Sequence, residues 1–279
     1  MENLLLHAKG FELFGLYINL YGLIIAIGMV VAIFVVCSIC KKRGFKTEDI
    51  YIVALYAIPL AILGARLYYV TFSENIYTFW QVFEIWKGGL AIYGAVIGGA
   101  LGVVLYCVIH KKNFLAIADI AVIGLILGQG IGRIGCYFAD CCYGIEVTNE
   151  SLQWFPLATQ IAGVWHYSTF FYESFCDLVI FGILLFLIIK KINVKGIIMS
   201  LYFVFYGFAR CIIETFRGDS LYFLTVKVSQ ILSLLLMVAG IISMVIIYTK
   251  HNKSKKVSVV EDTATNGDAV ENNNNTQND

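Results

Sequence analysis

Three arginines lie within or at the end of long apolar stretches, and their side chains have the most evident chemical potential in the sequence. They are Arg66, Arg133 and Arg210. An unpaired guanidinium is costly in an apolar environment, but it forms bidentate, charge-assisted hydrogen bonds with phosphate. Two interpretations follow: the arginines snorkel individually to a membrane surface, or they line a pocket for an anionic phospholipid headgroup.

A second group of reactive side chains lies in GRIGCYFADCCYG, residues 132–144, where Cys136, Cys141 and Cys142 follow Arg133. Their spacing does not match the paired CxxC of structural zinc sites, and the stretch has no histidine. We therefore assign no metal site and no cofactor. On an oxidising face, Cys136 could form a disulfide with Cys141 or Cys142, or a thiolate beside Arg133 could act as a nucleophile. The remaining cysteines are expected to pack as small apolar groups.

Membrane helices must position these residues. Of 279 residues 59% are hydrophobic and 14% charged, and the mean hydropathy is +0.80, outside the usual range of soluble domains. An apolar stretch of about 20 residues crosses a hydrocarbon core as a helix. The sequence predicts an all-α integral membrane protein with about seven transmembrane helices: residues 17–40, 50–70, 89–109, 115–135, 170–189, 196–213 and 227–248.

The distribution of lysine and arginine predicts the orientation. Basic residues follow the first, third, fifth and last spans, whereas the loops on the other side hold Lys9, Lys87 and Arg217. Positive charge is retained on the cytoplasmic side, so we expect the amino terminus outside and the carboxyl terminus in the cytoplasm. Residues 1–249 then form the membrane domain. Residues 250–279, which end in NNNNTQND, are expected to be a disordered polar cytoplasmic tail.

This orientation places the three arginines near the outer ends of the second, fourth and sixth spans. Three cations at one depth favour the headgroup pocket over separate snorkelling. Other polar groups are predicted at the same level: Tyr21, Tyr93, His166, Tyr172, Glu173, Asp177, Glu214, Arg217 and Gln230.

Some of these groups also have purely structural interpretations. Arg210 and Glu214 are four residues apart, so they share a helix face; the pair is either a structural ion pair or a device that holds the guanidinium in one rotamer for a ligand. His166, directly before the fifth span, is either a capping or interface residue or a base. Gly94, Gly98 and Gly102 recur every four residues, a spacing that permits close helix approach in lipid. Gly128 and Gly132 on the fourth span have the same spacing. The shared spacing suggests that the third and fourth spans, which carry Tyr93 and Arg133, are neighbouring helices.

Several segments resemble, in order and spacing, the prolipoprotein diacylglyceryl transferases of bacterial plasma membranes. They are YGL (21–23), GARLYYV (64–70), WKGGLAIYG (86–94), GQGIGRIG (128–135), HYSTFFYE (166–173), YGFARCIIETFR (206–217) and SQILS (229–233). The resemblance implies a plasma-membrane enzyme that transfers a diacylglyceryl group from phosphatidylglycerol to the lipobox cysteine of a prolipoprotein. The implied partners are that phospholipid, the lipobox peptide and the membrane, with no nucleic acid.

The resemblance also implies roles for individual residues. Arg133 and Arg210 would bind the phosphate and stabilise the leaving group, with Tyr93 and Glu214 as the other catalytic candidates. Many family members have histidine where this chain has Tyr93, and a tyrosine of ordinary pKa is a poor base at neutral pH. The implied substrate-binding residues are Arg133, Arg66, Tyr21, Gly135, His166, Tyr172, Glu173, Arg217 and Gln230.

The chain departs from the family signature G-R-x-G-N-F-x-N-x-E-x-x-G. Cys136, Ala139 and Cys141 replace the two asparagines and the glutamate, and Asp140 is the nearest alternative carboxylate. An alternative function is therefore a divergent paralogue that binds or modifies another phospholipid or acceptor, with or without turnover. A transporter is disfavoured, because transporters place their polar groups at the membrane midplane, whereas here they concentrate in the outer third.

Overall fold

The computed structural model describes residues 9–13, 16–73, 77–85, 88–190, 194–218, 222–223 and 226–275. Within these residues, seven helices are long and apolar enough to cross a membrane. They are α2 (Leu20–Ile39), α3 (Thr47–Phe72), α5 (Ile92–Ile109), α6 (Phe114–Gly135), α7 (Thr169–Ile189), α8 (Ile197–Ile213) and α9 (Val228–Asn275). The predicted number of membrane helices is confirmed. The sidedness of the termini stays a prediction.

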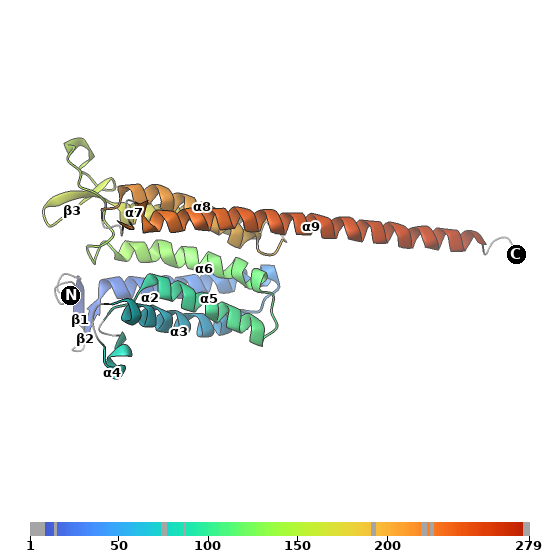
Figure 1. Cartoon of the computed structure of the whole chain (residues 1–279), viewed down its shortest axis with the longest axis horizontal. Coiled ribbons are helices and arrows are strands. Elements are labelled where there is room, and N and C mark those ends of the chain that lie inside the picture. Colours follow the sequence, from blue (N-terminus) through green and yellow to red (C-terminus); the bar gives the residue numbers. More distant parts are fainter. Residues whose placement is uncertain are drawn as a thin grey trace.

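Helix α6 is the most buried of the seven and forms the centre of the bundle. Figure 1 shows α2, α3 and α5 on one side of it and α7, α8 and α9 on the other. Ile123 and Ile126 of α6 pack with Leu184 of α7 and Ile198 of α8 in the main apolar core. Residues near the end of α6 are therefore placed between two groups of helices.

Short elements at the ends of the helices depart from the predicted all-helical fold. The described residues include three two-stranded antiparallel hairpins: β1 (Gly10–Leu13) with β2 (Leu16–Asn19), β3 (Ala158–Ile161) with β4 (Val164–Tyr167), and β5 (Tyr222–Phe223) with β6 (Val226–Lys227). The remaining short elements are α4 (Phe79–Val82) and the 3₁₀ turns η1 (Cys40–Arg43), η3 (Glu150–Leu152) and η4 (Glu214–Phe216). We call the end of the bundle that carries β1–β2, β3–β4 and α4 the hairpin end (Figure 1).

The glycine stripe of α5 packs on α3. A methyl group added at Gly98 would overlap the Leu60 carbonyl, and one added at Gly102 would lie 2.6 Å from the Cα atom of Ala57. The stripe thus serves close helix approach, as its spacing predicts. The glycines do not themselves join the helices of Tyr93 and Arg133, since Gly128 and Gly132 face α2. Helices α5 and α6 are nevertheless in contact, as the prediction of neighbouring helices requires.

At the opposite end, a buried carboxylate anchors α8. Asp119 accepts hydrogen bonds from the backbone amides of Gly196 (2.8 Å) and Met199 (2.9 Å), and it lies 3.6 Å from Arg43. A carboxylate at a helix N-terminus satisfies free amides and complements the helix dipole. Asp119 is therefore a structural group, with no need of a transported ion to explain it.

Helix α9 projects beyond the other helices (Figure 1). Its backbone stays helical to Asn275, across the predicted boundary at residue 249 and through the segment predicted to be a disordered tail; residues 276–279 lie outside the described part. The sequence of the segment after residue 249 is strongly polar. The division into a membrane domain and a tail stays a prediction.

Candidate functional site

Five charged side chains meet at the hairpin end, and we call them the Glu173 cluster: Arg133, Glu173, Arg210, Glu214 and Arg217. The Glu173 carboxylate is shared by three guanidinium groups. Arg133 Nε lies 2.7 Å from Oε2, Arg217 Nη1 lies 3.5 Å from Oε1, and Arg210 Nη1 donates to Oε1. Glu214 Oε2 lies 3.1 Å from Arg210 Nη2. The predicted pairing of Arg210 and Glu214 is therefore present within a larger network.

Three helix ends bring these residues together. Arg133 lies in the last turn of α6, Glu173 lies in the second turn of α7, and Arg210 lies in the last turn of α8. The Ser174 hydroxyl donates to the Gly130 carbonyl at 2.7 Å and so ties α7 to α6 just below the cluster. Cations near helix C-termini are favoured by the helix dipole. The helix ends thus hold arginines at positions where the backbone carries partial negative charge.

The cluster concentrates guanidinium groups in a largely buried setting. The Glu173 and Glu214 side chains are 5% and 1% exposed, and the arginines are 12 to 19% exposed. Asp177 is also buried, and Lys227 donates to the Glu214 and Arg217 carbonyls. Guanidinium groups held in this way can form charge-assisted hydrogen bonds with an anion such as phosphate.

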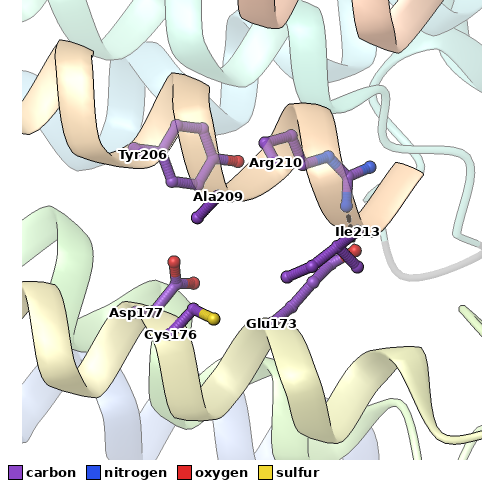
Figure 2. Close-up of a pocket in the computed structure, with 7 residues that line it drawn as sticks. All are labelled: Glu173, Cys176, Asp177, Tyr206, Ala209, Arg210 and Ile213. Carbon is purple, nitrogen blue, oxygen red and sulfur yellow. Dashed lines mark hydrogen bonds and ion pairs between the residues drawn. The ribbon is translucent and has the colours of Figure 1, made fainter. Parts of the chain in front are cut away.

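A small pocket adjoins the cluster between α7 and α8. Figure 2 shows Arg210 and Glu173 facing each other at one end and Tyr206 and Asp177 at the other, with Cys176, Ala209 and Ile213 also lining it. Its cavity volume is about 10 Å³, which is room for about one water molecule and far below the range of ordinary ligand pockets. It cannot take a whole phospholipid. A phosphate group would have to replace Glu173 as the partner of the arginines.

Three thiols lie beside the cluster. The sulfur atoms of Cys136, Cys141 and Cys142 are all within 4.8 Å of one another. Arg133 Nη1 donates to Cys142 Sγ at 3.4 Å, and Arg217 Nη2 does so at 3.7 Å. Hydrogen bonds from the Cys136 and Cys141 thiols, together with the two guanidinium groups, hold the pKa of Cys142 well below its usual range. Thiols and arginines therefore form one connected site.

All eight cysteines are free thiols. Of the two alternatives for Cys136, Cys141 and Cys142, the structure has the free thiols and not the disulfide, although the three sulfurs are close together. The expectation that the other cysteines pack as small apolar groups agrees with the burial of Cys40 and Cys107.

Arg66 lies outside the cluster. Its guanidinium donates to the backbone carbonyls of Gln81 (2.7 Å), Val82 (2.9 Å), Gly88 (2.8 Å) and Gly89 (3.2 Å). Tyr69 and Tyr77 present their rings to it at 5.8 and 5.5 Å. Only 4% of the residue is exposed. The predicted role of Arg66 as a supporting cation for a phosphate is not favoured, because four of its five N–H groups already hold the chain around α4.

Tyr21 and Gly135 lie next to the thiols. Tyr21 is in the first turn of α2, and its Cδ2 atom would lie 3.0 Å from a methyl group added at Gly135. A glycine at position 135 thus permits close contact between α6 and α2 at the site. These two predicted substrate-binding residues are near the cluster.

The other predicted residues make structural contacts. Tyr93 packs against Tyr68, with ring centroids 6.1 Å apart. His166 Nδ1 lies 3.0 Å from the Gly144 carbonyl, which agrees with the interface interpretation of this histidine. Tyr172 donates to the Leu157 carbonyl, and Gln230 Nε2 lies 3.5 Å from the Cys211 carbonyl. None of these contacts joins the residue to the Glu173 cluster.

Sequence reasoning missed two features of the site. The joint tethering of three arginines by Glu173 was not foreseen, because residues from three helices have no sequence spacing in common. Lys227 was also overlooked: its ammonium donates to the Glu214 carbonyl at 2.6 Å and to the Arg217 carbonyl at 2.8 Å. The signal that could have found it is a basic residue at the start of the seventh span, on the side where basic residues are rare.

Comparison with known proteins identifies the family. The sequence profile described as "Prolipoprotein diacylglyceryl transferase" matches residues 9–246. The chain belongs to the prolipoprotein diacylglyceryl transferase family.

Relatives in this family are similar over most of their length. A phosphatidylglycerol–prolipoprotein diacylglyceryl transferase 1 from Clostridium perfringens is 41% identical, over 85% of this chain and 92% of the relative. A transferase of the same type from Clostridium botulinum strain Loch Maree is 37% identical, over 88% of this chain and 98% of its own. One from Oceanobacillus iheyensis is 38% identical, over 88% of both chains. Cys136 and Cys141, two positions at which this chain departs from the family signature, belong to the cluster of three cysteines beside Arg133.

Proposed function

We propose that this protein transfers the diacylglyceryl group of phosphatidylglycerol to the cysteine thiol of a prolipoprotein lipobox, in the bacterial plasma membrane. The observation that carries the proposal is the Glu173 cluster, which holds three arginines and two glutamates at the end of a membrane bundle. The names of the relatives supply the substrates. We also propose that the hairpin end faces the outside of the cell, as the distribution of basic residues predicts.

The arginines bind the phosphate of the lipid. Arg133 and Arg210 are held in place by Glu173 before the substrate arrives, and the phosphodiester takes over these hydrogen bonds when it enters. The guanidinium groups of Arg133 and Arg210 keep an anionic partner throughout, and Glu173 keeps Arg217 as its cationic partner, so no buried charge is left unpaired. Glu214 stays bound to Arg210 and fixes its rotamer. Arg217 provides a third positive charge.

The reaction breaks the bond between the glycerol carbon and the phosphate oxygen. The acceptor thiolate attacks that carbon, and glycerol phosphate leaves with an additional negative charge on its phosphate. Donors that are already oriented toward this developing charge lower the barrier without reorganisation. The arginines therefore act most strongly in the transition state, which is the requirement for raising kcat.

The remaining predicted residues have supporting roles. Tyr21 and Gly135 shape the wall beside the thiols, and Arg66 holds the segment around α4 at the same end of the bundle. Tyr93 packs against the ring of Tyr68. His166, Tyr172 and Gln230 fix the chain segments that surround the cluster.

The proposal is tested by replacing Arg133 with Gln. Purified protein is incubated with phosphatidylglycerol and a lipobox peptide, and the peptide mass is measured. We expect a loss of transfer of about 100- to 1,000-fold, the usual cost of removing a donor to a developing anion. Lys190→Gln, which removes one positive charge at the far end of α7, should remain fully active. An Arg133→Gln variant that is inserted, monodisperse and active would contradict the proposal.

The same assay decides between this function and a divergent one. Other anionic phospholipids are offered in place of phosphatidylglycerol, with peptides that carry cysteine or serine at the lipobox position. Transfer that requires both phosphatidylglycerol and cysteine supports the proposed reaction. Binding of lipid without any change in peptide mass would indicate a lipid-binding paralogue.

A further inference from the structure

Cys136, Cys141 and Cys142 are arranged like the ligands of a metal ion. A zinc ion binds thiolates at about 2.3 Å in tetrahedral geometry, so its sulfur ligands are about 3.8 Å apart. The three sulfurs lie within 4.8 Å of one another, and small side-chain rotations suffice to close that difference. Among the described residues, this convergent group consists of the three thiols, which leaves a fourth position for an external ligand.

The backbone holds the thiols together at some energetic cost. Asp140 and Cys142 have φ values of +45° and +57°, in the left-handed region that costs a residue with a side chain about 1 to 2 kcal/mol. Aspartate tolerates this region, whereas cysteine has no special preference for it. Thr169 fixes the strained residue, because its hydroxyl donates to the Cys142 carbonyl at 2.6 Å. Such conformations persist where the surroundings enforce them, often at functional sites.

Two cations support the same arrangement. Arg133 and Arg217 direct N–H groups at Cys142 Sγ. Outer groups that donate to a ligating atom orient it and stabilise its charge in metal sites. Zinc with three thiolates carries one negative charge, and the two guanidinium groups that donate to Cys142 Sγ lie beside it. Their positive charge favours the metal-bound form.

The geometry points to a zinc site formed by Cys136, Cys141 and Cys142, whose fourth position takes the thiol of the acceptor cysteine. The role of the metal in thiol activation rests on the proposed transferase function; the metal site itself does not. Thiolate is the ligand type that zinc binds in sites of this kind, and a thiol that coordinates zinc is deprotonated.

The proton and electron balance of the reaction is simple. Cys136, Cys141 and Cys142 would hold the metal, and coordination would lower the pKa of the incoming thiol so that its proton passes to solvent water. The sulfur lone pair then forms the bond to the glycerol carbon. The electrons of the broken carbon–oxygen bond pass to the phosphate, which the arginines hold. No separate protein base is needed, in agreement with a signature that has Cys141 in place of a carboxylate.

The metal content of the purified full-length protein tests the site. Protein is prepared in detergent with a thiol reductant, equilibrated with Zn²⁺ and freed of unbound metal. Its zinc content is then measured by elemental mass spectrometry. We expect about one zinc per chain, and a loss of most of it in Cys141→Ser and Cys142→Ser. The matched control is Cys37→Ser, in α2 toward the opposite end, which should retain the metal. Zinc-free protein with three alkylatable thiols, or with a disulfide, would overturn the proposal.

A second measurement uses wild-type protein and so does not depend on the folding of a variant. Co²⁺ replaces the zinc, and its visible spectrum reports tetrahedral thiolate coordination. A lipobox peptide should shift this spectrum, whereas the same peptide with serine for cysteine should not. A spectrum that is unchanged by the cysteine peptide would refute the acceptor role.

The two proposals fail separately. Transfer at full rate by zinc-free protein would overturn the metal inference and leave the proposed function standing. Stoichiometric zinc without transfer from phosphatidylglycerol would leave the metal site standing and overturn the proposed function.

Discussion

Arg66 and Arg133 are alike in the sequence, because each is an arginine at the same end of a long apolar helix. Their partners differ in kind. Arg66 donates to four backbone carbonyls, whereas Arg133 shares the Glu173 carboxylate with two other arginines. Carbonyls are neutral and belong to the fold, but a shared carboxylate can be replaced by another anion. The comparison separates an arginine that holds the chain from one that can bind a ligand.

Charge makes the same distinction. The segment around Arg66 compensates its cation with oriented carbonyl dipoles and two aromatic rings. The Glu173 cluster compensates its guanidinium groups with carboxylates instead. An anion can take the place of a carboxylate at Arg133 and Arg210, whereas at Arg66 it would have to displace the backbone.

The largest effect should come from Arg210. Replacement by Gln removes the guanidinium that links Glu173 and Glu214, and we expect transfer to fall by about 100- to 1,000-fold. Arg210→Lys keeps the charge but loses the fork geometry, so it should be intermediate. Peptide mass after incubation with phosphatidylglycerol is the measurement. Equal activities of the Lys and Gln variants would show that geometry at this position does not matter.

Replacement of Arg66 by Gln should affect stability instead. Most of its hydrogen bonds to the four backbone carbonyls are lost, and each group left unsatisfied costs up to about 1 to 3 kcal/mol. Because the segment can relax toward solvent, we expect a total loss of about 2 to 4 kcal/mol in the free energy of unfolding. The midpoint of heat-induced aggregation in detergent and protease cleavage within residues 77–91 measure it.

The surviving folded fraction of Arg66→Gln should keep most of its transfer activity per molecule. A variant that is as stable as the wild type but inactive would break the comparison, because Arg66 would then act on the substrate.

A smaller loss is expected from the helix contact next to Arg66. In Gly98→Ala the new methyl group overlaps the Leu60 backbone, so α5 must move away from α3; we expect a loss of about 1 to 3 kcal/mol in stability. Gly99→Ala is the matched control, because its methyl group would meet the Ala61 Cβ atom at an ordinary 3.6 Å. Equal melting temperatures of the two variants would show that the α3–α5 contact is looser than the structure has it.

Much of this architecture follows from the sequence. The helix bounds of α6, Phe114–Gly135, agree within one residue with the predicted span, because long apolar runs have few alternatives in lipid. The gathering of Arg133, Arg210, Glu173 and Glu214 was also foreseen, since depth in the membrane can be read from position along each span.

Depth alone does not give lateral position. Arg66 was predicted at the same level as Arg133, yet the packing of α3 on α5 turns it toward the segment around α4. The thiols were dismissed as metal ligands because their spacing is not CxxC, but the left-handed backbone at Asp140 and Cys142 brings them together. Such backbone turns at residues other than glycine have no reliable sequence signal.

The smallest effect separates two roles within the cluster itself. Glu173 can be displaced by the substrate phosphate, whereas Glu214, 1% exposed and 3.1 Å from Arg210 Nη2, should remain paired throughout the reaction. Glu214→Gln keeps an acceptor oxygen but removes the charge, and Arg210 retains Glu173 in the resting state. In this variant the Arg210 rotamer is least well held when phosphate has taken the place of Glu173.

We therefore expect kcat of Glu214→Gln to fall by about 10-fold, or about 1.4 kcal/mol, with little change in KM for phosphatidylglycerol. Steady-state kinetics with the lipobox peptide in excess measure both constants. A variant in which KM rises while kcat is kept would place Glu214 in lipid binding, because uniform loss of ground-state and transition-state binding changes KM alone. The cluster would then act as one anion site, without the division between an exchangeable and a permanent carboxylate.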